Sequence, residues 1–220
     1  MTTKKQNAPN EKETGRIEAF SDGVFAVAIT LLVFDLKVPQ LSPNEINFTA
    51  LASALLHQWP SYLTFVTSFA TILIMWAGHH NIFKLVHKSD SLFLFANGFL
   101  LLLVTFVPFP TSLVAQYLRT PAAALACAVY AGVFVLVNIA YNLLWWSAAY
   151  HRRLLNPDIS PAQVKMLSRN FLLGTPLYLL ATLLAFWYPY VSVGICSSLW
   201  IFWIFSSYQS APRHQGIIGE

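Results

Sequence analysis

The chain has 220 residues, of which 56% are hydrophobic and only 10% are charged, and its formal net charge is +4. Together with an aromatic content of 15% and a mean hydropathy of +0.57, this composition is typical of an integral membrane protein. It excludes a soluble domain, because the polar segments at the two ends are too short to fold. The basic excess is spread over short segments and gives no indication of nucleic-acid binding.

Six apolar stretches are long enough to cross a bilayer, because a spanning α-helix needs about 20 predominantly apolar residues. The sequence therefore predicts an all-α membrane protein with six transmembrane helices and with both termini on the same side. Pro108 and Pro110 are expected to break the third helix near its outer end. The six stretches are residues 20–38, 60–83, 91–114, 122–149, 171–188 and 190–208.

The distribution of basic residues predicts the orientation. All but two of the 13 Lys and Arg residues fall on the side of the termini, and only Lys37 and Arg119 fall on the other. Because cytoplasmic loops are enriched in basic residues, we expect cytoplasmic N- and C-termini. Residues 1–15 and 209–220 are then cytoplasmic tails that flank a transmembrane domain of residues 16–208.

Two connections carry signals for the start of a helix. Residues 42–45 (Ser-Pro-Asn-Glu) have the form of a capping box, and they predict a short amphipathic helix on the outer surface that ends before Trp59. Residues 160–161 (Ser-Pro) predict a helix start after the fourth span. Gly174 and Pro176 are expected to kink the fifth span.

The first span opens with a polar cluster that contains Arg16, Ser21 and Asp22. Charged groups at this depth are costly, so they require a physical reason. One interpretation is that Ser21 and Asp22 cap the helix N-terminus, where a carboxylate gains from the helix dipole, while Arg16 lies at the headgroups. The other is a buried polar network that aligns this helix against its neighbours.

Polar residues of later helices fall at the same depth. Trp76, His79 and His80 end the second span on the cytoplasmic side, and Asn97 lies early in the third. A set of Arg, Ser, Asp, Trp, His and Asn side chains at one level favours a connected network over isolated residues.

Helical periodicity divides the rest of the first helix into two faces. One shares the side of Asp22 and is expected to pack into the bundle. The other is turned by about 140° at Val27 and is expected to face lipid or a symmetry axis. The first face carries Phe25, Ala26, Ile29 and Val33, and the second carries Val27, Thr30, Leu31, Phe34 and Val38.

The string Arg-x-x-x-Phe-Ser-Asp-Gly at residues 16–23 resembles the start of the first helix in prokaryotic members of the transmembrane protein 175 family. The Trp-x-x-His-His string at residues 76–80 and the six-helix topology agree with this resemblance. It implies a potassium-permeable channel that assembles as a homotetramer in the plasma membrane. The first helix of each subunit would line the pore.

The resemblance also implies roles for individual residues. An apolar constriction is expected at Val27, Leu31 and Phe34, and a selectivity layer at Thr30. The implied partners are other copies of the chain, the lipid bilayer and permeant monovalent cations such as K⁺, with no cofactor, resident metal or nucleic acid. The structural polar network would comprise Arg16, Phe20, Ser21, Asp22, Trp76, His79, His80 and Asn97.

The motifs of other channel classes are missing from the sequence. It contains no Thr-Val-Gly-Tyr-Gly string and no ladder of Arg residues, so neither a carbonyl-lined filter nor a voltage sensor is indicated. We therefore expect apolar side chains and a few hydroxyls to gate the pore, with modest selectivity for potassium over sodium.

Two other functions remain open. A proton-coupled secondary transporter would use Asp22 with His79 or His80 as a relay, although no inverted repeat supports it. A membrane enzyme or haem protein would carry histidines through the membrane core, whereas all but His57 fall on the cytoplasmic side. A zinc site formed by His79, His80 and His87 is a weaker possibility. No nucleophile and base are suitably placed, so we expect a protein that is not an enzyme.

Overall fold

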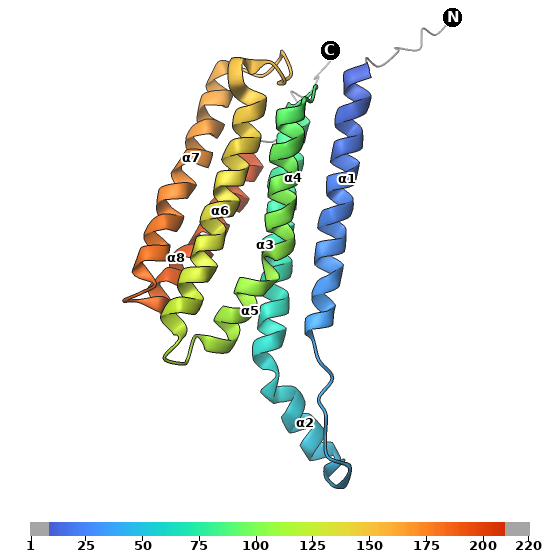
Figure 1. Ribbon diagram of the computed structural model, residues 1–220, viewed down its shortest axis with the longest axis vertical. Coiled ribbons are helices and arrows are strands. Elements are labelled where there is room, and N and C mark those ends of the chain that lie inside the picture. The colour runs from blue at the N-terminus through green and yellow to red at the C-terminus, as the bar shows by residue number, and fades with distance from the viewer. Residues whose placement is uncertain (1–8, 210–220) are drawn as a thin grey trace, which may run out of the picture.

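The computed structural model describes residues 9–209 and, within them, the side chains of residues 14–205 apart from 35 and 45 (Figure 1). Its secondary structure is helical except for one isolated bridge between Val86 and Leu155, which confirms the predicted all-α class. The predicted C-terminal tail, except residue 209, and the first half of the N-terminal tail lie outside the described residues.

Long helices run side by side in a bundle, and α2 projects from the end opposite to the start of α1 (Figure 1). Short 3₁₀ helices at Leu32–Asp35, Pro43–Glu45 and Tyr150–Arg152 lie in the connections. The α-helices are α1 (Pro9–Leu31), α2 (Phe48–His57), α3 (Trp59–Leu85), α4 (Ser91–Phe106), α5 (Pro108–Tyr117), α6 (Ala123–Ala149), α7 (Pro161–Leu184) and α8 (Pro189–Gln209).

Four described segments are long and apolar enough to cross a membrane, and they coincide with the first four predicted spans. The predicted fifth and sixth spans correspond to α7 and α8, which lie beside α6 in the same bundle (Figure 1). Lys165 and Arg169 lower the hydropathy of the first half of α7. The structure therefore supports a multi-pass helical membrane protein. The four segments are Thr14–Phe34, Trp59–Leu85, Ser91–Tyr117 and Ala123–Arg152.

Proline has different effects on the third and fifth predicted spans. As predicted, the third is divided, since α4 ends at Phe106 and α5 begins at Pro108. By contrast, α7 continues through Gly174 and Pro176 as one helix. Pro108 can begin a new helix because the first turn requires no N–H donor from it.

Of the two interpretations of the polar cluster, the structure rules out the N-terminal cap. The helix α1 begins at Pro9, so Ser21 and Asp22 lie well inside it and cannot cap its N-terminus. The residues before Arg16 are polar but include good helix formers, Glu and Lys, after a proline at the first position. Hydropathy located the membrane segment and not the helix end.

The predicted cap of the outer helix was also misplaced. Residues 43–45 form a separate 3₁₀ turn, and Ser42 makes no side-chain capping bond. The side chain of Asn47 instead accepts a 2.8 Å hydrogen bond from the Ala50 backbone and caps α2. Asn and Ser are comparable N-caps, so the sequence allowed either start. At α7 the prediction was correct, because Ser160 accepts from the Gln163 backbone at 3.2 Å.

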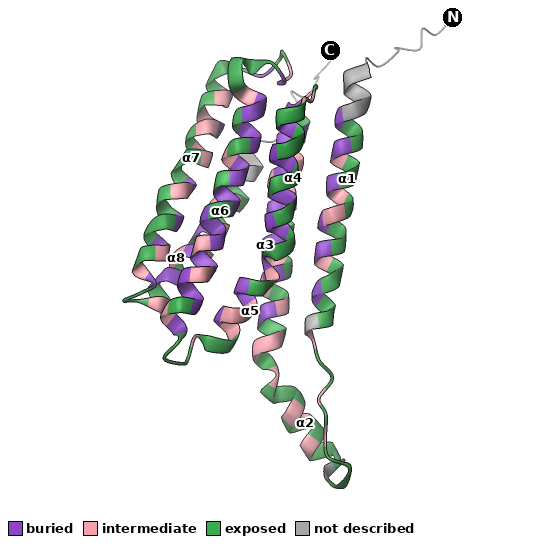
Figure 2. Ribbon diagram, viewed as in Figure 1, coloured by how far each residue is buried: buried purple, intermediate pink, exposed green. Residues whose placement is uncertain are grey.

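The best-buried of the four segments contains α6, in which 67% of the most apolar stretch is buried inside the bundle (Figure 2). This helix packs against α4, α5, α7 and α8. In contrast, α1 packs on α3 and α4, and 28% of its most apolar stretch is buried, the same share as in α3. Since α1 also lies at the edge of the bundle, it is a peripheral helix within a single chain (Figure 1).

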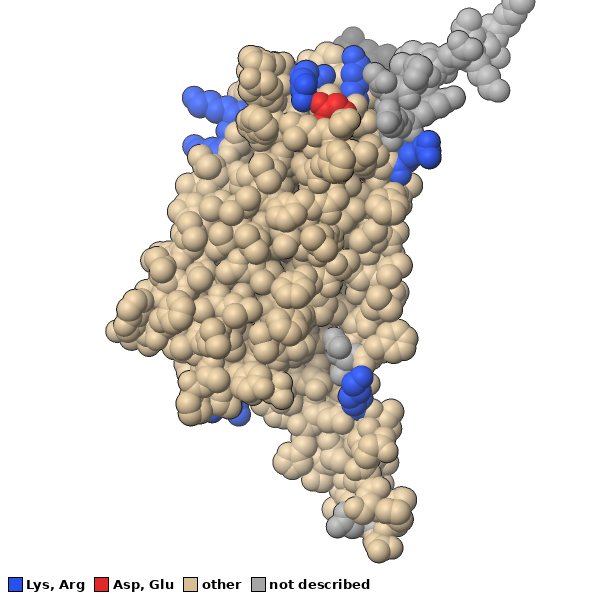
Figure 3. Space-filling view, viewed as in Figure 1, with Lys and Arg blue, Asp and Glu red and all other residues tan. Residues whose placement is uncertain are grey.

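Basic side chains concentrate at the end of the bundle where α1 starts, while the middle of the visible surface shows no charged side chain among the described residues (Figure 3). At this end, the loop after α3 is tied to the loop after α6. Asn156 donates its backbone N–H to Leu85 at 2.9 Å. Asp90, which caps α4, accepts a 2.5 Å ion-pair contact from Arg153. These contacts fix the end of α3 that carries the predicted polar residues.

Candidate functional site

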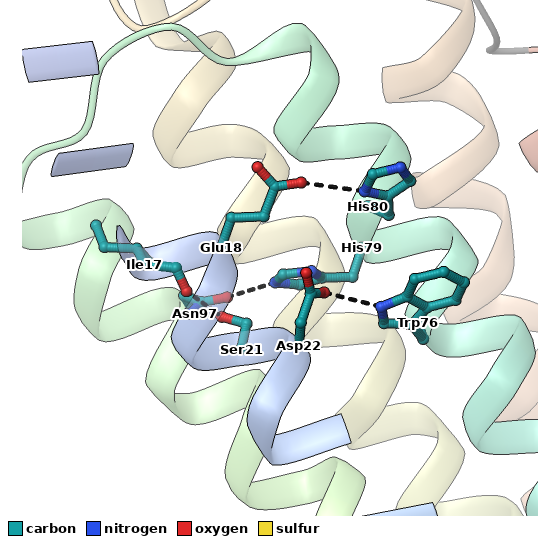
Figure 4. A network of polar contacts seen from close by, with 8 residues as sticks. All are labelled: Ile17, Glu18, Ser21, Asp22, Trp76, His79, His80 and Asn97. Atoms are coloured by element: carbon teal, nitrogen blue, oxygen red, sulfur yellow. Dashed lines mark hydrogen bonds and ion pairs between the residues drawn. The ribbon is translucent and has the colours of Figure 1, made fainter. Parts of the chain in front are cut away.

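A chain of three hydrogen bonds fastens α1 to α3 and α4 (Figure 4). The His79 ring of α3 lies 2.8 Å from the side-chain oxygen of Asn97 on α4. The Asn97 amide nitrogen donates to the Ser21 hydroxyl at 2.8 Å, and that hydroxyl donates to the Ile17 carbonyl one turn back. Ser21, His79 and Asn97 are buried, so water cannot replace these bonds cheaply.

The donor and acceptor directions of these hydrogen bonds determine the tautomer of His79. Because the Asn97 nitrogen donates to Ser21, its oxygen faces His79, and Nε2 of the histidine must carry the hydrogen. The other ring nitrogen is buried and has no partner among the described residues. The ring is held between Phe83, at 4.4 Å, and Phe25, at 5.3 Å between centroids. His79 thus acts as a packed structural donor.

Two further contacts join α1 to α3 nearby. The Trp76 indole donates to Asp22 at 2.8 Å, and the His80 ring lies 3.0 Å from the Glu18 carboxylate. The Trp76 and His80 rings stack, with an interplanar angle of 7°. We call the seven residues of these contacts the polar brace: Glu18, Ser21, Asp22, Trp76, His79, His80 and Asn97.

The structure brings together six of the eight residues predicted for the network. Arg16 and Phe20 lie on the exposed side of α1, and Arg16 forms no hydrogen bond or ion pair with any described residue. Sequence reasoning missed Glu18. Its position four residues before Asp22 could have indicated it, because this spacing places the two carboxylates on one side of a helix that begins before residue 18.

The packed face of α1 is rotated from the predicted one. Its centre runs through Ser21, Phe25 and Leu32, which lie about 60–100° around the helix from Asp22. Asp22 is therefore at the edge of this face and only partly buried. As a result, Phe25 and Ile29 pack as expected, but Ala26 and Val33 are exposed, and that part of the face assignment was wrong.

The opposite side of α1 is bare in the single chain. Val27, Leu31 and Phe34 expose 54%, 53% and 69% of their surface. Phe34 lies in the 3₁₀ turn that follows the end of α1. The exposed Thr30 hydroxyl donates to the Val27 carbonyl at 3.0 Å. We call Val27, Thr30, Leu31 and Phe34 the α1 stripe.

A groove of about 630 Å³ runs along the α1 stripe. Val27 and Leu31 line it from α1, and Thr105 and Pro108 line it where α4 passes into α5. Phe20 of the sequence motif also contributes to the wall. The groove is mainly apolar and has room for side chains of another helix.

No group of three or more His, Cys, Asp or Glu side chains in the described part of the chain could hold a metal ion. His79 and His80 are engaged in the brace, and the His87 ring contacts the Leu154 carbonyl at 3.1 Å. The three histidines considered for zinc therefore have separate surroundings.

The fold and the polar brace define a multi-pass helical membrane protein whose first helix has one packed and one bare face. The family described as endosomal/lysosomal potassium channel TMEM175 matches residues 16–108. A potassium channel of Chamaesiphon minutus is 50% identical over 91% of this chain and 98% of its own length. The chain belongs to the TMEM175 family, which is a family of ion channels and not of enzymes.

Further relatives and a solved structure support the same family assignment. A potassium channel of Streptomyces collinus is 42% identical over 79% of this chain and 83% of its own length. The crystal structure of a homologue, from Chamaesiphon minutus, of the lysosomal potassium-selective channel TMEM175 matches with a TM-score of 0.76. Its identity is 49%, and the match covers 89% of this chain and 98% of that one. The endosomal/lysosomal proton channel TMEM175 of Rattus norvegicus is 32% identical over 67% of this chain, but over only 30% of its own length.

Proposed function

We propose that the chain is a potassium-permeable cation channel whose pore is lined by the α1 stripe of several copies. The observation that carries this proposal is the contrast between the two sides of α1. One side is fixed by the polar brace, and the other leaves the large apolar side chains of Val27, Leu31 and Phe34 uncovered. Val27 and Leu31 also line a groove. The potassium channels among the relatives support K⁺ as the permeant ion.

The assembly we propose is a homotetramer. A single chain cannot enclose a pore with one helix, so the conduction path is incomplete without other copies, and the groove beside α1 offers space for them. In this arrangement α7 and α8 complete six spans. The basic end of the bundle faces the cytoplasm of a plasma membrane, and we propose that both termini are cytoplasmic.

The stripe supplies a hydrophobic constriction in place of a carbonyl-lined filter. Rings of Val27, Leu31 and Phe34 would keep a narrow passage dry and so oppose ion entry. Thr30 would form the polar layer, because its hydroxyl proton is used on the Val27 carbonyl while the oxygen lone pairs stay available for a cation. One hydroxyl ring in an apolar path provides only modest preference for potassium over sodium.

The proton-coupled transporter is the second candidate and has less support. The Asp22 carboxylate accepts from Trp76, whereas His79 and His80 contact Asn97 and Glu18. The proposed relay partners of Asp22 are thus engaged elsewhere in the brace.

The test uses purified protein in liposomes loaded with K⁺ or Na⁺, with flux followed by a proton-coupled dye after an ionophore is added. A channel gives passive flux that scales with the gradient and is larger for K⁺. Saturable uptake that requires a proton gradient, without passive flux, would support the transporter instead.

A further inference from the structure

A second feature of the chain lies on the side of α3 that faces away from α1. It is a cavity of about 70 Å³ enclosed by α3, α6, α7 and α8. A single water needs roughly 10–15 Å³, so this space is several times larger than an isolated hydration site. Met75 lines the cavity, whereas its neighbour Trp76 holds Asp22, so the cavity and the polar brace share one helix.

Aromatic rings form a large part of the cavity wall. Phe134 and Tyr178 stack at 5.6 Å between centroids, and Phe171 stacks on Trp203 at 5.8 Å. Rings of this kind bind another ring by offset stacking or edge contacts. The aromatic residues that line the cavity are Phe134, Tyr141, Phe171, Tyr178, Trp200 and Trp203.

The polar atoms beside the cavity are largely occupied by the protein itself. The Thr71 hydroxyl donates to Thr67 at 2.7 Å, and the Tyr141 hydroxyl donates to the Met75 carbonyl at 2.5 Å. The side-chain oxygen of Asn138 accepts from Thr175 at 2.6 Å. A buried water requires two to four polar partners, so these walls favour an apolar occupant over water.

One donor in the wall lacks an acceptor. The Trp200 indole nitrogen is buried and has no hydrogen-bond partner among the described residues. Leaving such a donor unpaired is unfavourable, and an acceptor on a bound molecule would relieve the cost.

We propose that this cavity binds a small, uncharged aromatic molecule that carries one hydrogen-bond acceptor and reaches the site through the bilayer. Its ring is held by the aromatic wall and its acceptor by Trp200. A charged molecule is excluded because none of the described residues that line the cavity is an Asp, Glu, Lys, Arg or His that would compensate its charge.

The test is photolabelling of the full-length protein in liposomes with 3-trifluoromethyl-3-phenyldiazirine, an uncharged aromatic probe, followed by mass spectrometry. We expect adducts on cavity residues such as Met75 and Phe171 that excess anisole competes away. Adducts confined to lipid-facing residues, or cavity adducts that anisole leaves unchanged, would overturn the proposal.

Two matched variants test whether the cavity is the binding site. Ile74→Phe places a larger side chain in the wall and should reduce the competable labelling at least about tenfold, because the space is filled. Leu73→Phe adds a ring at an exposed position of the same helix and should leave it unchanged. If Ile74→Phe does not fold, Val137→Leu, also in the wall, is the milder substitution and should weaken labelling in the same direction.

The role of Trp200 has its own readout. Anisole and toluene have similar rings, but only anisole carries an acceptor oxygen. Anisole should compete at lower concentration than toluene in the wild type, and this difference should disappear in Trp200→Phe. Equal competition by the two molecules in the wild type would contradict the acceptor requirement.

Discussion

The Asn97 amide lies 2.8 Å from the Ser21 hydroxyl, which joins residues 76 positions apart in the chain. Asn97 also meets His79 with its oxygen, so one side chain holds α1, α3 and α4 together. This junction explains how a peripheral helix keeps a fixed rotation, with one side packed and the other bare. Orientation of the α1 stripe therefore depends on a few buried polar bonds.

We predict that Ser21→Ala destabilises the protein, because it leaves the buried Asn97 amide with an unmet donor. The expected loss is about 1–3 kcal/mol, measured as a lower melting temperature in detergent. Ser198→Ala is the matched control, since Ser198 is exposed and bonds only to the preceding turn of its own helix. Equal melting temperatures of the two variants would show that the Ser21–Asn97 hydrogen bond does not stabilise the protein more than an exposed serine does.

The bond between Trp76 and Asp22 should be visible in a double-mutant cycle. Asp22→Asn removes the charge from this hydrogen bond, whereas Trp76→Phe removes the bond itself, and a hydrogen bond to a charged group contributes about 1.5–3 kcal/mol. Because the two side chains contact each other directly, the double variant should be less destabilised than the sum of the single variants. Melting temperatures of the four proteins provide the measurement.

Arg16 serves as the third residue in that experiment. It is exposed on α1 and makes no contact with Asp22, so Arg16→Ala should combine additively with Asp22→Asn. Strong coupling between these two substitutions would show that Arg16 belongs to the polar brace after all, as the sequence suggested.

Glycine at position 174 is required by close packing. A Cβ added there would lie 2.3 Å from the Asn138 amide nitrogen and 2.8 Å from a ring carbon of Trp203. Asn138 cannot yield easily, because its oxygen is bonded by Thr175 and Asn142. Gly174→Ala should therefore lower thermal stability by about 1–3 kcal/mol, as overpacking of a core does.

The control for this substitution is Gly194→Ala in α8. An added Cβ at Gly194 meets nothing within 4 Å, and alanine is the better helix former. The melting temperature should stay constant or rise slightly. A comparable loss at both glycines would indicate a general sensitivity of the bundle and not the contact with Asn138.

The sequence was sufficient to predict the all-α class, the segments of the first four spans and the polar partners of α1. Apolar length and residue type determine these features locally. The start of α1 and the rotation of its packed face were not predictable in the same way. The start was missed because hydropathy marks the apolar segment and not the polar turns before it. The rotation depends on the burial of Phe25 and Leu32, and Asp22, the residue used to define the face, lies at its edge.

Glu18 shows a related limit. Its contact with His80 joins residues 62 positions apart and requires α1 to begin before Ser21, the position that the capping interpretation gave to the helix start. The aromatic cavity behind α3 was not foreseen, because its walls come from four helices whose relative positions no local pattern specifies.

Orientation in the membrane can be tested with two cysteine variants. Ser42 and Lys88 are both exposed but lie in loops at opposite ends of the bundle. Since basic residues favour the cytoplasmic side, an impermeant maleimide applied to intact cells should label Ser42→Cys and not Lys88→Cys. Cys127 and Cys196 are buried, so the wild type provides the unlabelled reference. Labelling of Lys88→Cys alone would reverse the proposed topology.

The α1 stripe is the most direct test of the pore. Leu31→Ala or Phe34→Ala should raise the rate of K⁺ flux in liposomes, because a smaller apolar ring no longer keeps the constriction dry. Thr30→Val keeps the shape but removes the hydroxyl, so it should lower the ratio of K⁺ to Na⁺ flux while assembly in detergent is preserved.

Ile29→Ala separates a pore effect from loosened packing, because Ile29 lies on the same helix but packs against the core. It should lower the free energy of unfolding by about 2 kcal/mol or more, seen as a lower melting temperature, with little change in flux. A flux increase as large as that of Leu31→Ala would mean that any disturbance of α1 opens the pathway. If none of the three stripe substitutions changes flux or selectivity, this side of α1 faces lipid, and the conduction path must lie elsewhere.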